Sequence, residues 1–171
     1  MNCTNVLDEV IKLIKHPFPP LYNKDSRILI LGSFPSVKSR EQMFFYGHPQ
    51  NRFWKVISTV FECDEPKTVE EKKQFLFEHG IALWDVIASC EITGSSDSSI
   101  RNVKVNDLTK ILEEADIRQI FVNGRTAEKY FKKYTKAKIN QDALCLPSTS
   151  PANAACSVER LVQKWKVLKS I

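Results

Sequence analysis

Four short apolar runs, separated by segments of helical period, constrain the fold of this chain more than any other feature of its sequence. The runs are RILILGS (27–33), IALWDVI (81–87), QIFVNG (119–124) and ALCLPST (143–149). Short apolar runs rich in β-branched residues are typical of strands that are buried on both faces. Because strand and helix patterns alternate along the chain, we expect a parallel sheet covered by helices on both faces, with right-handed crossovers.

The expected helices are marked by apolar residues at helical spacing. Such residues recur in four segments, around 7–14, 108–115, 127–134 and 158–168. A further helix is indicated by Thr68 and Glu71, which have the spacing of a capping box, and Gly80 marks its end. With 171 residues, the chain fits one domain, 1–171, that buries its own core.

Polar loops follow all four expected strands. They read GSFPSVKS, DVIASCEITGSSDSS, NGRTAEK and PSTSPANAA. In open α/β sheets, ligand sites form at the carboxyl ends of the strands. We therefore expect the functional site at this edge of the sheet.

The charge is distributed unevenly along the chain. Residues 1–100 carry 11 Lys and Arg against 13 Asp and Glu, whereas residues 101–171 carry 14 against 7. A basic half suits a polyanionic partner, nucleic acid above all, because the neutralisation of phosphates releases counterions. A solvated basic surface without a partner is the alternative explanation of this pattern.

The five cysteines are scattered, with no CxxC pair and no His at the spacing of a zinc site. This predicts reduced thiols, no bound metal and a cytoplasmic location, with association to the nucleoid in a bacterium or archaeon. The first residues lack the pattern of a signal or transit peptide. No apolar run approaches the length of a membrane span, so no membrane partner is expected.

The segment FFYGHPQNRFW (44–54) gathers aromatic residues around a Gly and a Pro. Aromatic faces of this kind can stack on a nucleobase, while Arg52 and Lys55 can contact phosphate. The alternative is that Phe53 and Trp54 belong to the buried face of a helix that starts near Asn51. That alternative leaves Tyr46, His48 and Asn51 unexplained.

Two of the polar loops carry clusters of hydroxyl groups. GSFPSVKS offers Ser33, Ser36 and Ser39, which could hold a phosphate or a small ligand, but it has neither a P-loop nor a GxGxxG pattern, so a plain turn from strand to loop is the favoured explanation. In PSTSPANAA, two prolines bracket three hydroxyl residues just before a basic helix, where phosphate contacts are favourable. A helix-capping turn would explain some of these serines but not both prolines.

The motifs GSFPS, YGHPQNRFW, LWDV, FVNG and LPSTSPANA, in this order, resemble the uracil-DNA glycosylase superfamily. The resemblance covers about residues 16–165 and is greatest to the deoxyinosine (hypoxanthine) DNA glycosylase branch. It implies a three-layer α/β/α sandwich with a short, mainly parallel four-stranded sheet. The implied activity flips a deaminated base out of DNA and hydrolyses its N-glycosidic bond, leaving an abasic site, without a cofactor or metal.

The resemblance also implies a role for individual residues. Many relatives carry Asn or Asp where this chain has Ser33, so the water-positioning catalytic role falls to Asn51. The residues expected to bind the base are Ser33, Phe34, Phe45, Tyr46, His48 and Asp85. Those expected to contact the DNA backbone are Ser36, Ser39, Arg52, Ser148, Ser150, Pro151 and Asn153. The expected partner is DNA containing deaminated bases, bound by a monomer.

Several of these assignments have alternatives. Asp85 could cap a helix or pair with a Lys instead of binding the base, and His48 could be structural. HPFPPLY (16–22) resembles a stiff loop that compresses DNA, but a rigid lead-in to the first strand explains it as well. The alternative functions are a uracil or thymine mismatch-specific glycosylase, an inactive relative that only binds DNA or a nucleotide, and an unrelated Rossmann-like protein.

Overall fold

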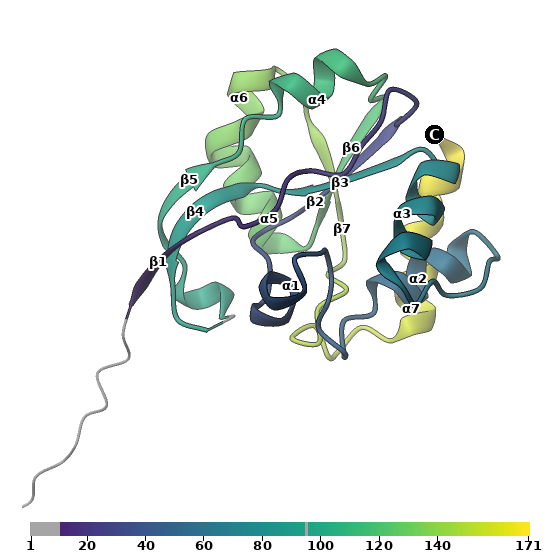
Figure 1. The fold of residues 1–171 in the computed structure, drawn as a ribbon, viewed down its shortest axis with the longest axis horizontal. Helices are drawn as coiled ribbons and strands as arrows, with labels where there is room; N and C mark the ends of the chain where they lie inside the picture. Colours follow the sequence, from purple (N-terminus) through teal and green to yellow (C-terminus); the bar gives the residue numbers. More distant parts are fainter. Residues whose placement is uncertain (1–10, 95) are drawn as a thin grey trace, which may run out of the picture.

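A computed structural model describes residues 11–94 and 96–171 of the chain. Its central layer is a parallel sheet with strand order β3-β2-β6-β7 (Figure 1). The strands are β2 (Ile28–Gly32), β3 (Ile81–Asp85), β6 (Gln119–Asn123) and β7 (Ala143–Leu146). Each lies within one of the four predicted runs, so the predicted parallel sheet is confirmed.

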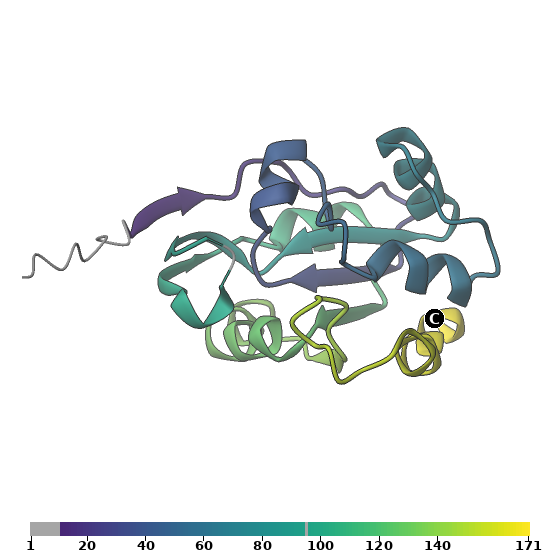
Figure 2. The same ribbon diagram turned by 90° about the horizontal axis from the view of Figure 1, so that it is seen from below.

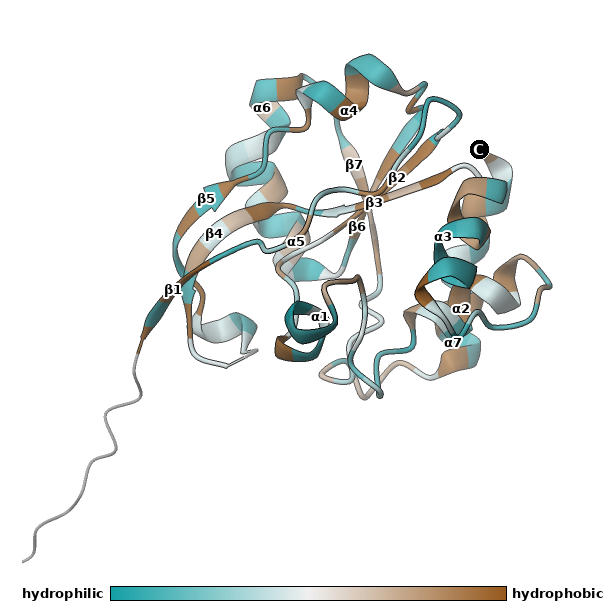
Figure 3. Cartoon of the chain, in the orientation of Figure 1, coloured by the Kyte–Doolittle hydropathy of each residue, from teal (hydrophilic) through white to brown (hydrophobic). Residues whose placement is uncertain are grey.

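Alternate side chains of these strands enter two separate hydrophobic cores, because successive residues of a strand point to opposite faces. Ile28 and Ile30 pack into one core, whereas Leu29 and Leu31 pack into the other. Figure 3 shows the apolar strands at the centre of the molecule, between helices whose outer faces are polar. This double burial explains why the strands read as continuous apolar runs.

Helices cover both faces of the sheet and complete the predicted three layers (Figures 1 and 2). One face is covered by α2 (Phe53–Val60), α3 (Val69–Glu78) and α7 (Val158–Trp165), which continues into the 3₁₀ turn η3 (Lys166–Ser170). The other is covered by α4 (Thr109–Glu114), α5 (Arg125–Tyr130), the π-helical turn η2 (Phe131–Thr135) and α6 (Lys136–Ile139). The short α1 (Val37–Gln42) follows β2 at the carboxyl edge of the sheet.

A second, antiparallel sheet with the order β1-β4-β5 was not predicted. Its strands are β1 (Lys12–Lys15), β4 (Ile87–Ile92) and β5 (Arg101–Val105). The loop predicted from Asp85 onward is therefore wrong: the chain passes through Val86 straight from β3 into β4, and only the following segment, with the 3₁₀ turn η1 (Asp97–Ser99), is a loop.

The helix predicted around residues 7–14 is also wrong within the described residues. Ile14 packs on a core, whereas Ile11 and Leu13 are exposed, which is the alternation of a strand rather than of a helix. The backbone of this segment pairs with β4. Leu7 and Val10, which were part of the helical pattern, lie outside the described residues.

The remaining sequence expectations concern cysteines and membranes. Cys63, Cys90, Cys145 and Cys156 are unpaired, and Cys3 lies outside the described residues. Within residues 11–94 and 96–171, no helix combines the length and the hydropathy that crossing a bilayer requires.

The predicted capping box at the start of α3 is confirmed, and it yields a stability prediction. Thr68 Oγ1 accepts a hydrogen bond from Glu71 N at 3.1 Å, and Glu71 Oε2 accepts one from Thr68 N at 3.2 Å. Thr68→Ala should lower the free energy of unfolding by about 1 kcal/mol, measured by urea denaturation. Thr59→Ala, on the exposed side of α2, serves as the control and should change it by less than about 0.5 kcal/mol. Equal effects of the two substitutions would contradict the capping role.

Candidate functional site

A cavity of about 270 Å³ opens at the carboxyl edge of the parallel sheet. In Figure 1 this edge faces down, where α1 and the loop after β7 lie, and Figure 2, which views the molecule from that end, shows these two segments apart from each other. The cavity is lined by twelve of the fourteen residues that the sequence singled out: Ser33, Phe34, Ser36, Ser39, Phe45, Tyr46, His48, Asn51, Asp85, Ser148, Ser150 and Pro151. The other two are Arg52 and Asn153.

Asn51 is held at the cavity by a chain of hydrogen bonds that starts in the sheet. Asn123, the last residue of β6, donates from Nδ2 to Thr149 Oγ1 at 3.0 Å, and Thr149 donates from Oγ1 to Asn51 Oδ1 at 2.9 Å. Asn123 Oδ1 also accepts from Thr149 N at 3.1 Å. Thr149 is fully buried, so these bonds are protected from water.

The carbonyl and the amide ends of Asn51 have different surroundings. Oδ1 accepts a second hydrogen bond, from Phe53 N at 2.9 Å, so both of its lone pairs are used. Within the described residues, Nδ2 donates to no group. The backbone N–H of Phe53 can only donate, which fixes the amide orientation. Asn51 therefore offers a hydrogen-bond donor to the cavity.

The aromatic segment provides walls of unequal exposure. Tyr46 is half-buried and stacks on Phe53, with 3.9 Å between ring centroids. Phe45 is only 3% exposed, because its ring also packs against Phe18 and Phe44 in the core. Burial, reinforced by the charge of Asp85, raises the pKa of Tyr46 well above its ordinary value, so its hydroxyl stays protonated. That hydroxyl is buried without a partner among the described residues.

Asp85, at the end of β3, pairs with a residue that the sequence analysis did not single out. His16 Nε2 lies 2.6 Å from Asp85 Oδ2, and both side chains are almost fully buried. The partner is therefore a His, and neither the Lys nor the helix cap that were considered. The only sequence signal for His16 was its position before Pro17, which favours an extended backbone beside the neighbouring strand.

The segment 16–22 that contains His16 follows the edge of the parallel sheet. Leu21 forms a β-bridge with Leu83 of β3, with N–H to carbonyl distances of 2.9 Å in both directions. The explanation of this segment as a lead-in to the first parallel strand fits this path.

Arg52 uses four of its five guanidinium N–H donors on backbone carbonyl oxygens. It donates to the carbonyl oxygens of Thr149 (3.3 Å), Ser150 (2.8 Å), Asn153 (3.0 Å) and Cys156. These bonds give Arg52 a structural role, and its contact with a phosphate stays a prediction. Arg52 stabilises the conformation of the loop after β7. No sequence pattern predicted that Arg52 would donate to these carbonyl groups.

The serine hydroxyls also shape the loops around the cavity. Ser36 caps α1 by accepting from Ser39 N at 3.1 Å, and Ser148 accepts from Ser150 N at 3.1 Å. Ser39 is only 2% exposed and accepts from Gly47 N at 2.9 Å. Ser39 also lines the cavity, and its contact with a phosphate stays a prediction, whereas Ser36, Ser148 and Ser150 are half-exposed residues at the rim.

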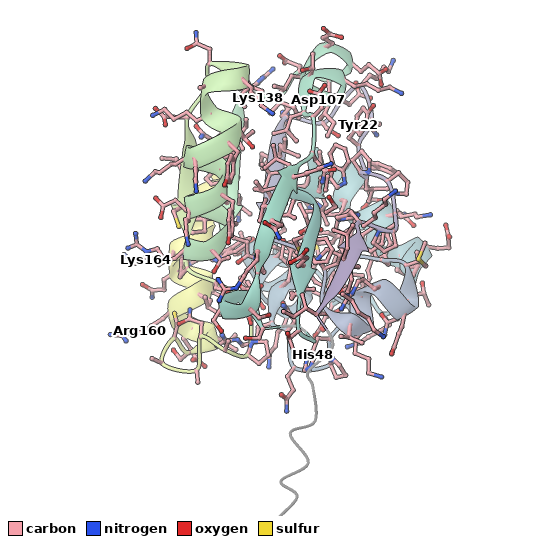
Figure 4. All side chains as sticks on the ribbon, turned by 90° about the vertical axis from the view of Figure 1, so that its left-hand side faces the viewer. Tyr22, His48, Asp107, Lys138, Arg160 and Lys164 are labelled. Carbon is pink, nitrogen blue, oxygen red and sulfur yellow. The ribbon has the colours of Figure 1, made fainter. Side chains whose placement is uncertain are left out.

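A wider groove of about 1030 Å³ lies on the other side of the loop after β7, between α5 and α7. Asn153 lines this groove rather than the cavity, together with Arg160 and Lys164 of α7. Figure 4 shows Arg160 and Lys164 on the same side of the molecule, with His48 at the lower end and Lys138 at the upper end. Arg160 and Lys164 are exposed and form no ion pair within the described residues.

Fold and cavity together define a class of protein: an α/β/α sandwich with an aromatic, polar pocket, large enough for a nucleobase, at the carboxyl edge of its sheet. The family model of the uracil DNA glycosylase superfamily matches residues 19–170. The chain belongs to this superfamily, as its motifs predicted.

Similar proteins point to the same branch of the superfamily. A hypoxanthine DNA glycosylase of Methanosarcina acetivorans is 34% identical over 158 residues, which cover 91% of this chain and 98% of the relative. One of Methanosarcina barkeri is 29% identical over 118 residues, covering 68% and 75%. A solution NMR structure of a candidate uracil DNA glycosylase from M. acetivorans matches with a TM-score of 0.76 and 30% identity, covering 92% of this chain and 99% of that one. The predicted resemblance to the hypoxanthine branch is confirmed.

The role of Arg52 can be tested with a substitution that keeps its charge. Lys cannot reach several carbonyl groups at once, so Arg52→Lys should lower the free energy of unfolding by about 1–3 kcal/mol and speed amide exchange in residues 149–156. Arg118→Lys, at an exposed arginine paired with Asp116, is the matched control. Unchanged stability of Arg52→Lys would refute the structural role.

Proposed function

We propose that this protein is a monofunctional DNA repair glycosylase that releases hypoxanthine from deoxyinosine. The observation that carries the proposal is the cavity, which combines the free amide donor of Asn51 with Asp85 and Tyr46 in a member of this superfamily. The curated relatives are named for hypoxanthine, which supports this base as the substrate. We propose that the protein acts as a monomer in the cytoplasm.

The reaction requires the base to leave the DNA stack and enter the cavity. Extrusion costs least at mismatched or damaged bases, which favours deoxyinosine over normal nucleotides. Phe34, which lines the cavity, offers a wall for stacking the flipped base. Tyr46 and His48 also line the cavity and are further base contacts in this proposal, and the ring of Tyr46 is held in place against Phe53.

Asn51 would place the attacking water. Because Oδ1 is saturated by two donors, the side chain can donate from Nδ2 to the water oxygen but cannot remove its proton. Its contribution is therefore positional: it aligns a lone pair of the water with the anomeric carbon as the bond to the base breaks. The DNA phosphates stabilise the positive charge that develops on the sugar.

The DNA backbone would cross the rim of the cavity. Ser36, Ser148, Ser150 and Pro151 lie at this rim, and exposed hydroxyls there suit phosphate contacts. The neighbouring groove adds the unpaired cations Arg160 and Lys164 together with Asn153. We propose that the groove binds the DNA strand beside the flipped nucleotide.

The catalytic assignment is tested with Asn51→Ala and duplexes containing one inosine, uracil, xanthine or thymine mismatch. Wild-type protein should yield alkali-labile sites at inosine. Asn51→Ala should lower the single-turnover rate by about 10²-fold or more, because the water loses its donor. Gln50→Ala, at the exposed neighbour, is the control and should retain activity. A rate of Asn51→Ala within about tenfold of wild type would exclude this role for Asn51.

The groove is tested by the salt dependence of DNA binding. Lys164→Gln and Arg160→Gln should each weaken binding and reduce the slope of log Kd against log salt concentration by about 1. Lys138→Gln, an equal change of charge at the other end of the molecule (Figure 4), should leave the slope unchanged. Equal slopes for Lys164→Gln and Lys138→Gln would remove the groove from the binding surface.

A further inference from the structure

The pair of His16 and Asp85 is the most deeply buried pair of potentially charged side chains in the part of the chain that the structure describes. Their side chains are only 4% and 7% exposed, and the distance from Nε2 to Oδ2 is 2.6 Å. A carboxylate can only accept hydrogen bonds, so Nε2 carries the proton and donates it. The carboxylate is thereby held by one of its two oxygens.

The surroundings of His16 favour this single arrangement. Its ring lies among Phe18, Phe34, Phe45 and Trp84, at centroid distances of 4.6, 6.1, 6.5 and 6.4 Å. An aromatic cage offers Asp85 Oδ2 no water in place of the imidazole, so the loss of the His donor would leave a buried carboxylate oxygen unsatisfied. Asp85 lines the cavity, whereas His16 lies behind it.

The backbone on both sides of the pair is also fixed. His16 N donates to Ala88 O at 2.7 Å and extends the pairing of β1 with β4. Asp85 O accepts from Asn106 Nδ2 at 2.8 Å, at the point where β3 passes into β4. These bonds fix the main chain from which the two side chains extend toward each other.

The second oxygen of Asp85 lies over Gly32, on the cavity floor. A Cβ atom at position 32 would lie 2.3 Å from Asp85 Oδ1, so only glycine leaves room for the carboxylate. The same point is 3.4 Å from the hydroxyl of Tyr46. Within the described residues, Oδ1 accepts no hydrogen bond and the Tyr46 hydroxyl donates none, although the Asn123 side chain lies close to that hydroxyl. The floor of the cavity thus holds a carboxylate oxygen without a donor close to a buried hydroxyl without an acceptor.

This pattern matches the edge that deamination creates on a base. Adenine has an unprotonated N1 beside an amino group, whereas hypoxanthine has N1–H beside a carbonyl oxygen. A carboxylate oxygen accepts from the N–H, and a hydroxyl donates to the carbonyl. Adenine would instead turn its N1 lone pair toward the carboxylate, which would place two acceptors against each other. A closed site with such a mismatch of polar groups strongly favours hypoxanthine over adenine.

We propose that His16 is a positioning residue which, through Asp85, makes the pocket specific for bases with an N–H beside a carbonyl. This inference rests on the proposed function, because it assumes that a base occupies the cavity. Hypoxanthine, xanthine and uracil share this edge. Guanine and thymine carry it too, so their exclusion depends on other contacts, with the amino group of guanine and the methyl group of thymine.

The test compares two duplexes that differ only in one nucleotide, which is deoxyinosine in one and deoxynebularine in the other. The purine base of deoxynebularine has neither N1–H nor a 6-carbonyl. The measured quantity is the ratio of the two single-turnover release rates. His16→Phe fills the cage but removes the donor, and it should lower the ratio about tenfold or more. His16→Gln keeps an N–H near the position of Nε2 and should keep the ratio within about threefold of wild type.

Two further variants separate positioning from folding. Phe18→Leu disturbs the cage without touching the hydrogen bond, so it should leave the ratio unchanged even where it lowers the melting temperature. Asp85→Asn retains the shape of the side chain but can turn an N–H toward the base, so it should lower or invert the ratio. If His16→Phe fails to fold, the proposal is tested by comparing the ratio of release rates of His16→Gln with that of Asp85→Asn. The ratio of His16→Gln should be the higher one, and equal ratios for these two variants would overturn the proposal.

Binding of free bases distinguishes this inference from the proposed function. Titration of wild-type protein with free hypoxanthine and free purine should show tighter binding of hypoxanthine, and His16→Phe should abolish the difference. If wild-type protein released no base but this difference were found, the glycosylase proposal would fail and the role of His16 would stand. If wild-type protein released hypoxanthine and His16→Phe kept the ratio within about threefold of wild type, the role of His16 would fail and the glycosylase proposal would stand.

Discussion

The hydrogen bonds from Asn123 through Thr149 to Asn51 join three parts of the chain that are remote in sequence. They connect the end of β6, the loop after β7 and Asn51, two residues before α2, all at the carboxyl edge of the sheet. Each side chain in this series of hydrogen bonds provides a partner for the next one. Without them, the buried Thr149 would carry an unpaired hydroxyl. The position of Asn51 is therefore set by the rigid sheet rather than by the flexibility of its own segment.

Arg52 completes this arrangement from the neighbouring position. Its guanidinium donates hydrogen bonds to carbonyl groups of the loop after β7, and Arg52 N also donates to Thr149 O at 3.1 Å. Pro147 and Pro151 restrict the same loop, so little conformational entropy remains to be lost when a ligand binds. A loop prepared in this way can hold hydroxyl and amide groups ready for a phosphate without support from regular secondary structure.

The parallel sheet could be predicted because its strands are buried on both faces. Each strand therefore appears in the sequence as an unbroken apolar run. It did not predict β4, where IASCEI mixes polar and apolar residues because only part of the strand is covered. Strand β1 was mistaken for a helix because four residues of KLIK cannot establish a period, and its partner lies more than seventy residues away. The same separation hid His16, whose significance depends entirely on Asp85.

The cavity was predictable as a place but not as a set of bonds. Loops with Ser, Asn and Pro after each strand indicated the edge, and the motif resemblance indicated the residues. Which atoms remain free depends on distances that no pattern records: Asn51 has its donor free, and Asp85 has one acceptor free.

Different parts of the molecule hold these two free groups in place. Asn51 is fixed through β6 and the loop after β7, whereas Asp85 is fixed through His16 and Asn106. The hydrogen bonds that hold one do not include the other. A substitution behind Asp85 should therefore displace the carboxylate while the amide of Asn51 stays in place, so the proposed contact with the base edge and the proposed positioning of water can vary independently.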